Sequence, residues 1–189
     1  MKKENITISD KFLAVTFLRL FPSFIVPNHL TLARFFATPF VLYFVFLEDY
    51  VIGITLFSLA AFTDALDGAM ARTRNQVTEW GKTFDPLADK LLIGLTALIV
   101  IPKYLDFQLI FLILVIEALF IVSAYYIKQR EGEIQANGWG KTKMIFQSFG
   151  IGFILLFALI NIPLLLVIAN VLLYVSILFA VISLVSHGI

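Results

Sequence analysis

The chain has 189 residues, 60% of them hydrophobic and 14% charged, and its formal net charge is +1. Soluble domains are normally about 45–50% apolar with about a quarter of their residues charged, so this composition excludes a soluble domain and most apolar side chains must face lipid. The absence of cysteine excludes disulfides, thiolate metal sites and cysteine nucleophiles.

The first segment, residues 1–22, is expected to form a separate helix at the cytoplasmic membrane surface. Within it, residues 8–21 place apolar side chains at helical spacing, at Phe12, Val15, Leu18 and Phe21. An amphipathic helix lying on the inner leaflet is one interpretation of this pattern. A helix packed against the membrane spans is the alternative.

Residues 23–189 are expected to form one domain of six transmembrane helices. Apolar stretches of about 17–25 residues are long enough to cross the hydrocarbon as helices. Six such stretches lie at roughly residues 30–47, 51–71, 85–101, 107–127, 144–161 and 163–186. Each must be helical, because lipid offers no water to the backbone groups. The predicted fold class is an all-α membrane protein with six transmembrane helices and an N-terminal interfacial amphipathic helix.

The distribution of lysine and arginine predicts the orientation in the membrane. With six spans, both termini lie on the same side as the loops at residues 72–83 and 128–143. This side carries most of the basic residues, whereas the opposite loops offer only Lys103. Because cytoplasmic loops are enriched in positive charge, we expect a multi-pass protein of the cytoplasmic membrane with both termini on the cytoplasmic side.

Four aspartates flank the loop between the second and third spans. Asp64 and Asp67 are three residues apart, and Asp85 and Asp89 are four apart, so each pair lies on one face of its helix. The short loop makes the two helices antiparallel neighbours. The four carboxylates are therefore expected to converge in an active site just inside the membrane, on its cytoplasmic side.

Four ionised carboxylates at this separation repel one another strongly, so positive charge must accompany them. Arg72, Lys82 and Lys90 are candidate counter-ions. Mg²⁺ or Mn²⁺ fits better, because such hard cations prefer oxygen ligands. Two of these ions would clamp a phosphate group during displacement at phosphorus.

Two other interpretations of the aspartates stay open. One is a structural cluster of charges paired with nearby basic residues. The other is a cation or proton transporter, since transporters also carry intramembrane acids. A transporter would spread its acids across the bilayer and would move ions without a nucleotide, whereas these four are expected at one depth.

The residues from Asp64 to Asp89 read D-x2-D-G-x2-A-R-x8-G-x3-D-x3-D without a departure. This pattern resembles the signature of the CDP-alcohol phosphatidyltransferase family. The resemblance implies a membrane enzyme that transfers the phosphatidyl group of CDP-diacylglycerol to an alcohol and releases CMP. It also implies that Asp64, Asp67, Asp85 and Asp89 hold two divalent cations, with Asp89 acting as general base on the acceptor hydroxyl.

The same resemblance implies that Gly68, Arg72 and Thr78 bind the CDP part of the lipid substrate. Upstream, residues 27–34 resemble the family's opening P-N-x-L-T-x-x-R stretch, in which Asn28 and Thr31 contribute to the nucleotide-lipid pocket. Taken without the resemblance, Asn28 and Thr31 are helix-capping residues of the first span.

The acceptor alcohol is inferred from residues around the fourth and fifth spans. Residues 140–147 resemble the G-K-x-K-T-x-x-Q stretch of the glycerol-phosphate-accepting branch, the phosphatidylglycerophosphate synthases, with Met144 in place of threonine. In that branch an arginine precedes the glutamate of the fourth span, whereas this chain has Ile116, so an inositol phosphate or another polar alcohol stays open. The candidate acceptor-binding residues are Lys141, Lys143, Glu117 and Arg130.

Each of these acceptor candidates has a second interpretation. Glu117 is expected either to line the pocket or to orient Lys141 or Arg130. The two lysines at the start of the fifth span are equally well explained as positive charge flanking a membrane helix. The acceptor assignment therefore depends on the glycine–lysine stretch.

The expected partners follow from the family resemblance. They are CDP-diacylglycerol, a small phosphorylated alcohol, the lipid bilayer and a second copy of the chain in a homodimer. No nucleic-acid partner is expected.

Overall fold

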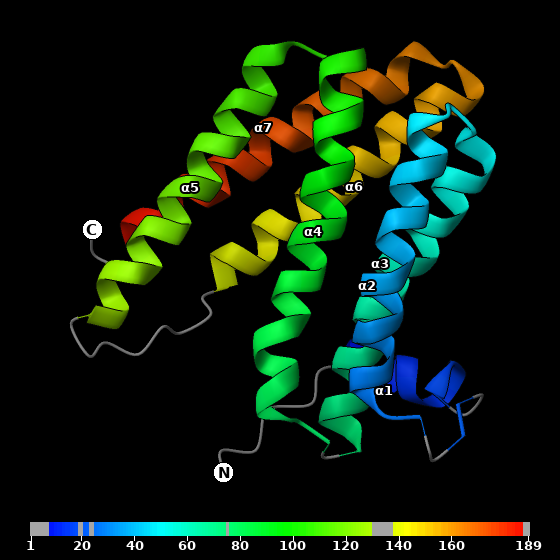
Figure 1. Ribbon diagram of the computed structural model, residues 1–189, viewed down its shortest axis with the longest axis vertical. Helices are drawn as coiled ribbons and strands as arrows, with labels where there is room; N and C mark the ends of the chain where they lie inside the picture. The colour runs from blue at the N-terminus through cyan, green and yellow to red at the C-terminus, as the bar shows by residue number, and fades with distance from the viewer. Residues whose placement is uncertain (1–7, 19–20, 23–24, 75, 130–137, 187–189) are drawn as a thin grey trace. The chain divides into compact units, whose positions relative to one another are not determined.

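The computed structural model describes residues 8–18, 21–22, 25–74, 76–129 and 138–186, and these ranges contain helices and short turns but no β-strand (Figure 1). The helices are α1 (Ile8–Thr16), α2 (Pro27–Phe46), α3 (Tyr50–Thr73), α4 (Glu79–Tyr104), α5 (Phe107–Gln129), α6 (Gly138–Ile160) and α7 (Pro163–Ser186). The predicted all-α architecture is confirmed over the described residues.

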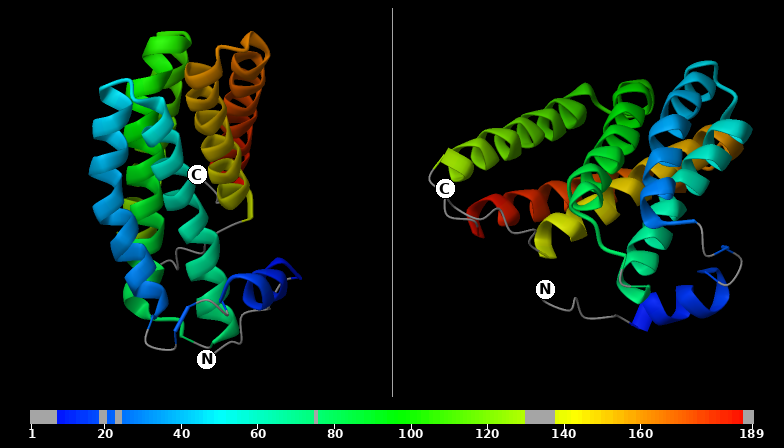
Figure 2. Two further views of the ribbon diagram at one scale, coloured as in Figure 1. Left: turned by 90° about the vertical axis from the view of Figure 1, so that its right-hand side faces the viewer. Right: turned by 60° about the horizontal axis from the view of Figure 1, so that its bottom comes forward.

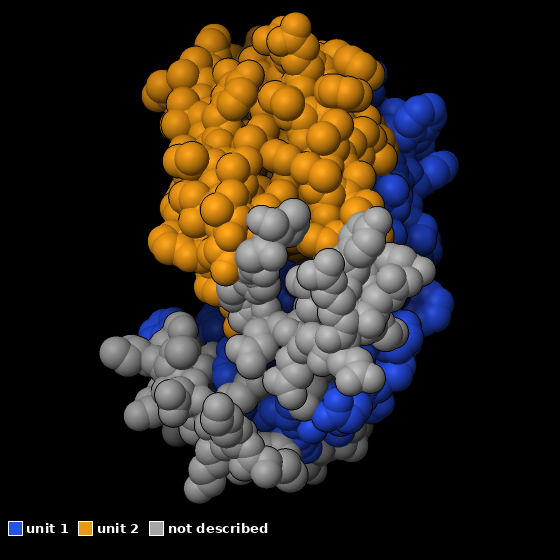
Figure 3. Space-filling model, turned by 90° about the vertical axis from the view of Figure 1, so that its left-hand side faces the viewer, with its two compact units in different colours: residues 1–95 blue, residues 96–189 orange. Residues whose placement is uncertain are grey.

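Two compact units divide the chain, Met1–Leu95 and Thr96–Ile189 (Figure 3). The boundary falls within α4, so this helix contributes its first part to one unit and its last part to the other. The expected domain over residues 23–189 includes parts of both units and stays a prediction.

In the first unit, α2 and α3 pack side by side as an antiparallel pair (Figure 2). α2 begins with Pro27, since proline lacks an N–H that the first helical turn would leave unpaired. α3 begins after Asp49, whose carboxylate accepts a hydrogen bond from the Ile52 N–H at 3.2 Å. At Gly53 an added Cβ would lie 3.0 Å from Val45 Cγ2, so the small residue lets the two helices approach closely.

α1 packs against α3 through one of its faces. Leu13 and Ala14 contact a buried cluster that contains Leu66 and Met70 of α3. On another face, the Phe12 side chain is 64% exposed. The expected N-terminal helix is therefore present. It packs against a long helix, as the second of the two interpretations predicts. The position of its exposed apolar face at the membrane surface stays a prediction.

In the second unit, α6 and α7 form an antiparallel pair, and α5 packs on α7 (Figure 1). The turn between α6 and α7 contains Asn161 with a positive φ of 54°, followed by Pro163 at the start of α7. Asparagine tolerates this left-handed conformation and proline suits the first turn of a helix, so this sequence ends one helix and starts the next.

Four helices, α2, α3, α6 and α7, are long and apolar enough to cross a membrane. α5 has a shorter apolar stretch, Phe107–Ser123. Large apolar side chains such as Phe36 and Phe46 are 70% and 74% exposed, as expected of residues that face lipid. Over the described residues these are the features of a membrane protein, and the number of six spans stays a prediction.

Candidate active site

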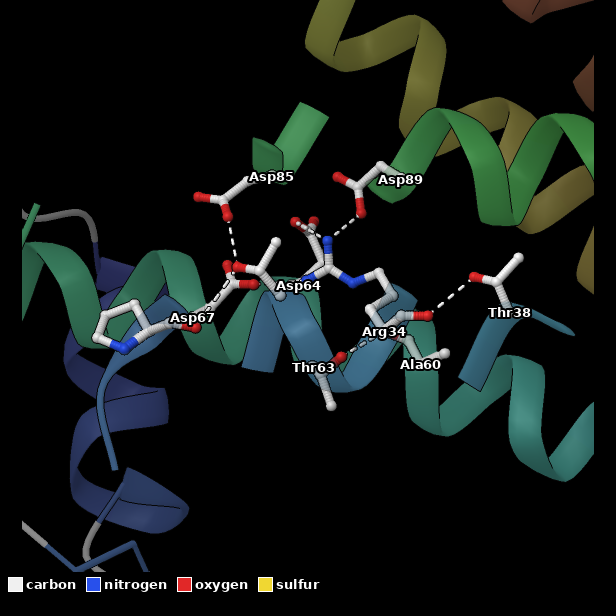
Figure 4. Close-up of polar contacts among 10 residues, drawn as sticks. Arg34, Thr38, Ala60, Thr63, Asp64, Asp67, Asp85 and Asp89 are labelled. Atoms are coloured by element: carbon white, nitrogen blue, oxygen red, sulfur yellow. Dashed lines mark hydrogen bonds and ion pairs between the residues drawn. The ribbon is translucent and has the colours of Figure 1, made fainter. Parts of the chain in front are cut away.

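α3 and α4 carry the four aspartates of the sequence motif, all of them within the first unit. Asp64 and Asp67 lie in the last turns of α3, and Asp85 and Asp89 lie in the first turns of α4. The Asp67 side chain is 2% exposed, whereas the Asp64 side chain is 46% exposed. Figure 4 shows Asp64, Asp67 and Asp89 directed toward one guanidinium, so three of the four carboxylates converge as the helix-face argument predicts.

That guanidinium belongs to Arg34 of α2. Its Nη1 donates to the Asp89 carboxylate and lies 3.3 Å from Asp64 Oδ1, while its Nη2 donates to Asp67 Oδ2 at 2.5 Å (Figure 4). The Arg34 side chain is fully buried. Arg34 therefore joins α2 to both aspartate-bearing helices through charged hydrogen bonds, which are stronger than neutral ones.

Arg34 is not among the site residues expected from the sequence. Two signals were present: the residue ends the P-N-x-L-T-x-x-R stretch, and four close acids require a positive charge. The contacts themselves join residues that are 33 and 55 positions apart, so no local pattern reveals them.

The fourth aspartate, Asp85, has a partner of its own on α2. The hydroxyl of Thr31, which is fully buried, donates a hydrogen bond to Asp85 Oδ1. One turn earlier on α2, Asn28 Oδ1 accepts a hydrogen bond from the Thr78 hydroxyl at 2.9 Å. The structure thus brings together four of the predicted site residues at the adjoining ends of α2 and α4.

Two of these residues were also interpreted as helix caps, and the structure shows that interpretation to be wrong. The N-cap of α2 is Val26, so Asn28 and Thr31 lie inside the helix. A threonine caps α4 instead. Thr78 directly precedes this helix, and its hydroxyl oxygen accepts a hydrogen bond at 2.9 Å from the N–H of Gly81 in the first turn.

Two glycines of the aspartate motif lie where an added side chain would crowd site residues. At Gly81, an added Cβ would lie 3.1 Å from Thr78 Oγ1, 3.2 Å from Asp85 Oδ2 and 3.3 Å from Asn28 Oδ1. At Gly68, it would lie 3.1 Å from Nη2 of Arg72. The absence of a side chain at these positions therefore allows polar groups to approach the backbone closely.

The acceptor candidates belong to the second unit. Lys143 of α6 donates from Nζ to the Glu117 carboxylate of α5, and the two side chains are 6% and 25% exposed. The same Nζ lies 4.7 Å from the centre of the Phe120 ring. Glu117 is therefore joined to Lys143, whereas Lys141 is exposed and Arg130 lies outside the described residues.

The suitability of the aspartate cluster as a metal centre depends on its donor atoms. Within the described part of the chain, no group of three or more acidic or histidine side chains has an arrangement that could hold a metal ion. The guanidinium of Arg34 lies among the carboxylates instead. The donor set itself fits hard divalent cations, because it consists of carboxylate oxygens.

Comparison with known proteins identifies the family of the chain. A family model described as CDP-alcohol phosphatidyltransferase matches residues 24–183. The CDP-diacylglycerol–glycerol-3-phosphate 3-phosphatidyltransferase of Rickettsia bellii is 33% identical over 135 residues, which cover 69% of this chain and 74% of that protein. The protein of the same name from Aquifex aeolicus is 31% identical over 165 residues, covering 86% of this chain and 93% of the relative. The human cardiolipin synthase (CMP-forming) is 36% identical over 109 residues, covering 56% and 36% respectively. The resemblance that the aspartate motif predicts is confirmed.

Proposed function

This chain belongs to the CDP-alcohol phosphatidyltransferase family, and from that premise we propose that it transfers the phosphatidyl group of CDP-diacylglycerol to glycerol 3-phosphate. The observation that carries the proposal is the set of aspartates on α3 and α4 that converge on one buried arginine. The choice of glycerol 3-phosphate is supported by the names of the two relatives that cover most of this chain.

The reaction is a displacement at the phosphorus atom that carries the diacylglycerol. The hydroxyl oxygen of the acceptor forms a new bond to this phosphorus, the bond to the CMP oxygen breaks, and CMP leaves. Asp89 accepts the hydroxyl proton as general base, because a carboxylate within hydrogen-bond reach favours the attacking alkoxide. Its partly exposed side chain allows a second substrate to approach it.

Two divalent cations, Mg²⁺ or Mn²⁺, belong to this proposal. Asp64, Asp67, Asp85 and Asp89 would hold them, since the family uses divalent cations and these residues supply oxygen ligands. When bound, the cations supply positive charge beside the diphosphate.

The CDP part of the substrate is assigned to residues beside the aspartates. Arg72, in the last turn of α3, lies against Gly68, and its guanidinium suits paired hydrogen bonds to a phosphate. Thr78 donates a hydrogen bond to Asn28 at the start of α4, and Thr31 donates one to Asp85. A nucleotide would therefore meet polar groups whose positions are fixed before it binds.

The acceptor is assigned to Lys141, Lys143, Glu117 and Arg130. Three of these carry positive charge, which suits the phosphate of glycerol 3-phosphate. The bond between Glu117 and Lys143 supports a positioning role for Glu117. An inositol phosphate or another polar alcohol is the alternative acceptor within the same chemistry.

The proposal includes a place in the cell. The chain would be a multi-pass protein of the cytoplasmic membrane, with both termini and the active site on the cytoplasmic side, and would act as a homodimer in the bilayer. The support is the positive charge of the loops that the sequence places on that side.

The test is an acceptor panel with labelled CDP-diacylglycerol. Purified protein in detergent with Mg²⁺ or Mn²⁺ is given glycerol 3-phosphate, an inositol phosphate or a glycerol-bearing phospholipid, the last because a cardiolipin synthase is among the relatives. CMP release and the lipid product are measured by chromatography. Glycerol 3-phosphate is expected to give the fastest turnover, and a different preferred alcohol would refute the acceptor assignment while keeping the reaction class.

A substitution tests the aspartate chemistry directly. Asp85→Asn is expected to abolish turnover while the protein remains folded in detergent, because the neutral amide lacks the negative charge with which a carboxylate attracts a divalent cation. The matched control is Asp49→Asn, at the start of α3, where asparagine caps a helix as well as aspartate does. An active Asp85→Asn protein argues against the proposal, and ion flux in vesicles without any nucleotide would favour the transporter instead.

A further inference from the structure

Arg34 has contacts that the proposed reaction does not by itself explain. Its side chain is fully buried, and its two Nη atoms contact Asp64, Asp67 and Asp89 (Figure 4). Its backbone oxygen is also held, because the Thr38 hydroxyl donates to it at 2.9 Å. The guanidinium is therefore fixed in the middle of the acidic cluster.

The charges of this cluster do not balance within these contacts. Three carboxylates share one guanidinium, and like charges at such distances repel strongly where water is scarce. A guanidinium keeps its proton in proteins, so Arg34 contributes a permanent positive charge. Without it, the acids of α3 and α4 would repel each other across the helix pair.

Arg34 contacts one oxygen of each of these three carboxylates, so a divalent cation bound by the same residues would share the carboxylates with the guanidinium. The cation would also be repelled by the positive charge of the guanidinium. Binding of a cation and retention of all the Arg34 contacts therefore oppose each other.

We propose that Arg34 is the resident counter-ion of the aspartate cluster, which holds the acids together before divalent cations bind and weakens the binding of those cations. The inference rests on the proposed function insofar as that function assigns cations to the aspartates. It goes beyond that function by assigning Arg34 to the control of metal affinity and of metal-free stability.

The experiment measures thermal unfolding of the detergent-purified protein during titration with Mn²⁺, without lipid substrate, after treatment with a chelator. A ligand that binds the folded state raises the unfolding temperature as its concentration passes the dissociation constant. For Arg34→Gln, we expect a lower unfolding temperature in chelator, because the acids lose their counter-ion. We also expect the half-maximal Mn²⁺ concentration to fall about tenfold or more, because a repelling charge has been removed.

Two further variants separate charge from other effects. Arg34→Lys keeps a positive charge, so its half-maximal Mn²⁺ concentration should stay close to that of the unmodified protein. Arg74→Gln is the matched control: Arg74 donates to the backbone oxygens of Leu18 and Phe21 at 2.8 and 3.1 Å, away from the aspartates. It should lower the unfolding temperature without changing the Mn²⁺ midpoint.

Each outcome supports or overturns the counter-ion role of Arg34. An Arg34→Gln midpoint equal to that of the unmodified protein overturns the counter-ion role, and so does an Arg34→Lys midpoint that matches the glutamine variant. If Arg34→Gln unfolds in chelator, the proposal requires that Mn²⁺ restore its folded state, and failure of that rescue overturns it. If Mn²⁺ does not stabilise even the unmodified protein, the metal assignment in the proposed function is what fails.

Discussion

Removing the charge of Glu117 is expected to destabilise the second unit by about 3 kcal/mol. The reason is that the Lys143 ammonium, whose side chain is only 6% exposed, would lose its carboxylate partner. Breaking a buried ion pair by removing one partner typically costs about 3–5 kcal/mol. The lower end of this range applies here for two reasons. The Glu117 side chain is 25% exposed, and the Phe120 ring, whose centre is 4.7 Å from Lys143 Nζ, continues to stabilise the ammonium.

The assay is a double-mutant cycle on the unfolding free energy in mixed micelles containing a denaturing detergent. The variants are Glu117→Gln, Lys143→Met and the two combined. Because the double variant leaves neither charge buried, it should lose about 2 kcal/mol less than the sum of the single variants. Glu117→Gln combined with Lys141→Met is the matched control, since Lys141 is exposed, and these two effects should add.

A coupling free energy below about 0.5 kcal/mol would refute the reasoning, because that is the scatter expected of independent sites. It would mean that water or other groups solvate Lys143 when Glu117 is neutral. Coupling of the same size in the Lys141 control would show that Glu117 acts on the general charge of this helix end and not on Lys143.

Three glycine substitutions test the packing and the site. Gly150→Ala should destabilise the protein by about 1–3 kcal/mol in the same unfolding assay, because the new Cβ would lie 2.8 Å from Leu173 Cγ of α7; an unchanged stability would contradict the close contact of α6 and α7. Gly94→Ala is the comparison, since nothing lies within 4 Å of its added Cβ, and it should be neutral or slightly stabilising. Gly81→Ala should reduce CMP release about tenfold, because the added Cβ would lie 3.1 Å from Thr78 Oγ1 and 3.2 Å from Asp85 Oδ2 and would force these groups to shift slightly; full activity would show that Thr78 and Asp85 move aside without consequence.

The sequence predicted the positions of the long helices, because a helix that crosses a bilayer needs a run of apolar residues as long as the hydrocarbon is thick. Each of the six predicted stretches coincides with one long helix. Their starts were less accurate: α4 begins at Glu79 and α6 at Gly138, six residues before the predicted positions in both cases. A helix continues through polar residues wherever its backbone hydrogen bonds continue, so hydropathy gives only the part that is apolar.

The sequence also predicted that the aspartates converge, since their spacing sets which face of each helix they occupy. That Arg34 lies among three of them and that Thr31 contacts the fourth, Asp85, is seen only in the folded chain. Arg34, Thr31 and Lys143 find partners that are 26 to 55 positions distant in the chain. Such contacts depend on how one helix packs against another, and that packing is set by the side chains of the whole interface rather than by any local pattern.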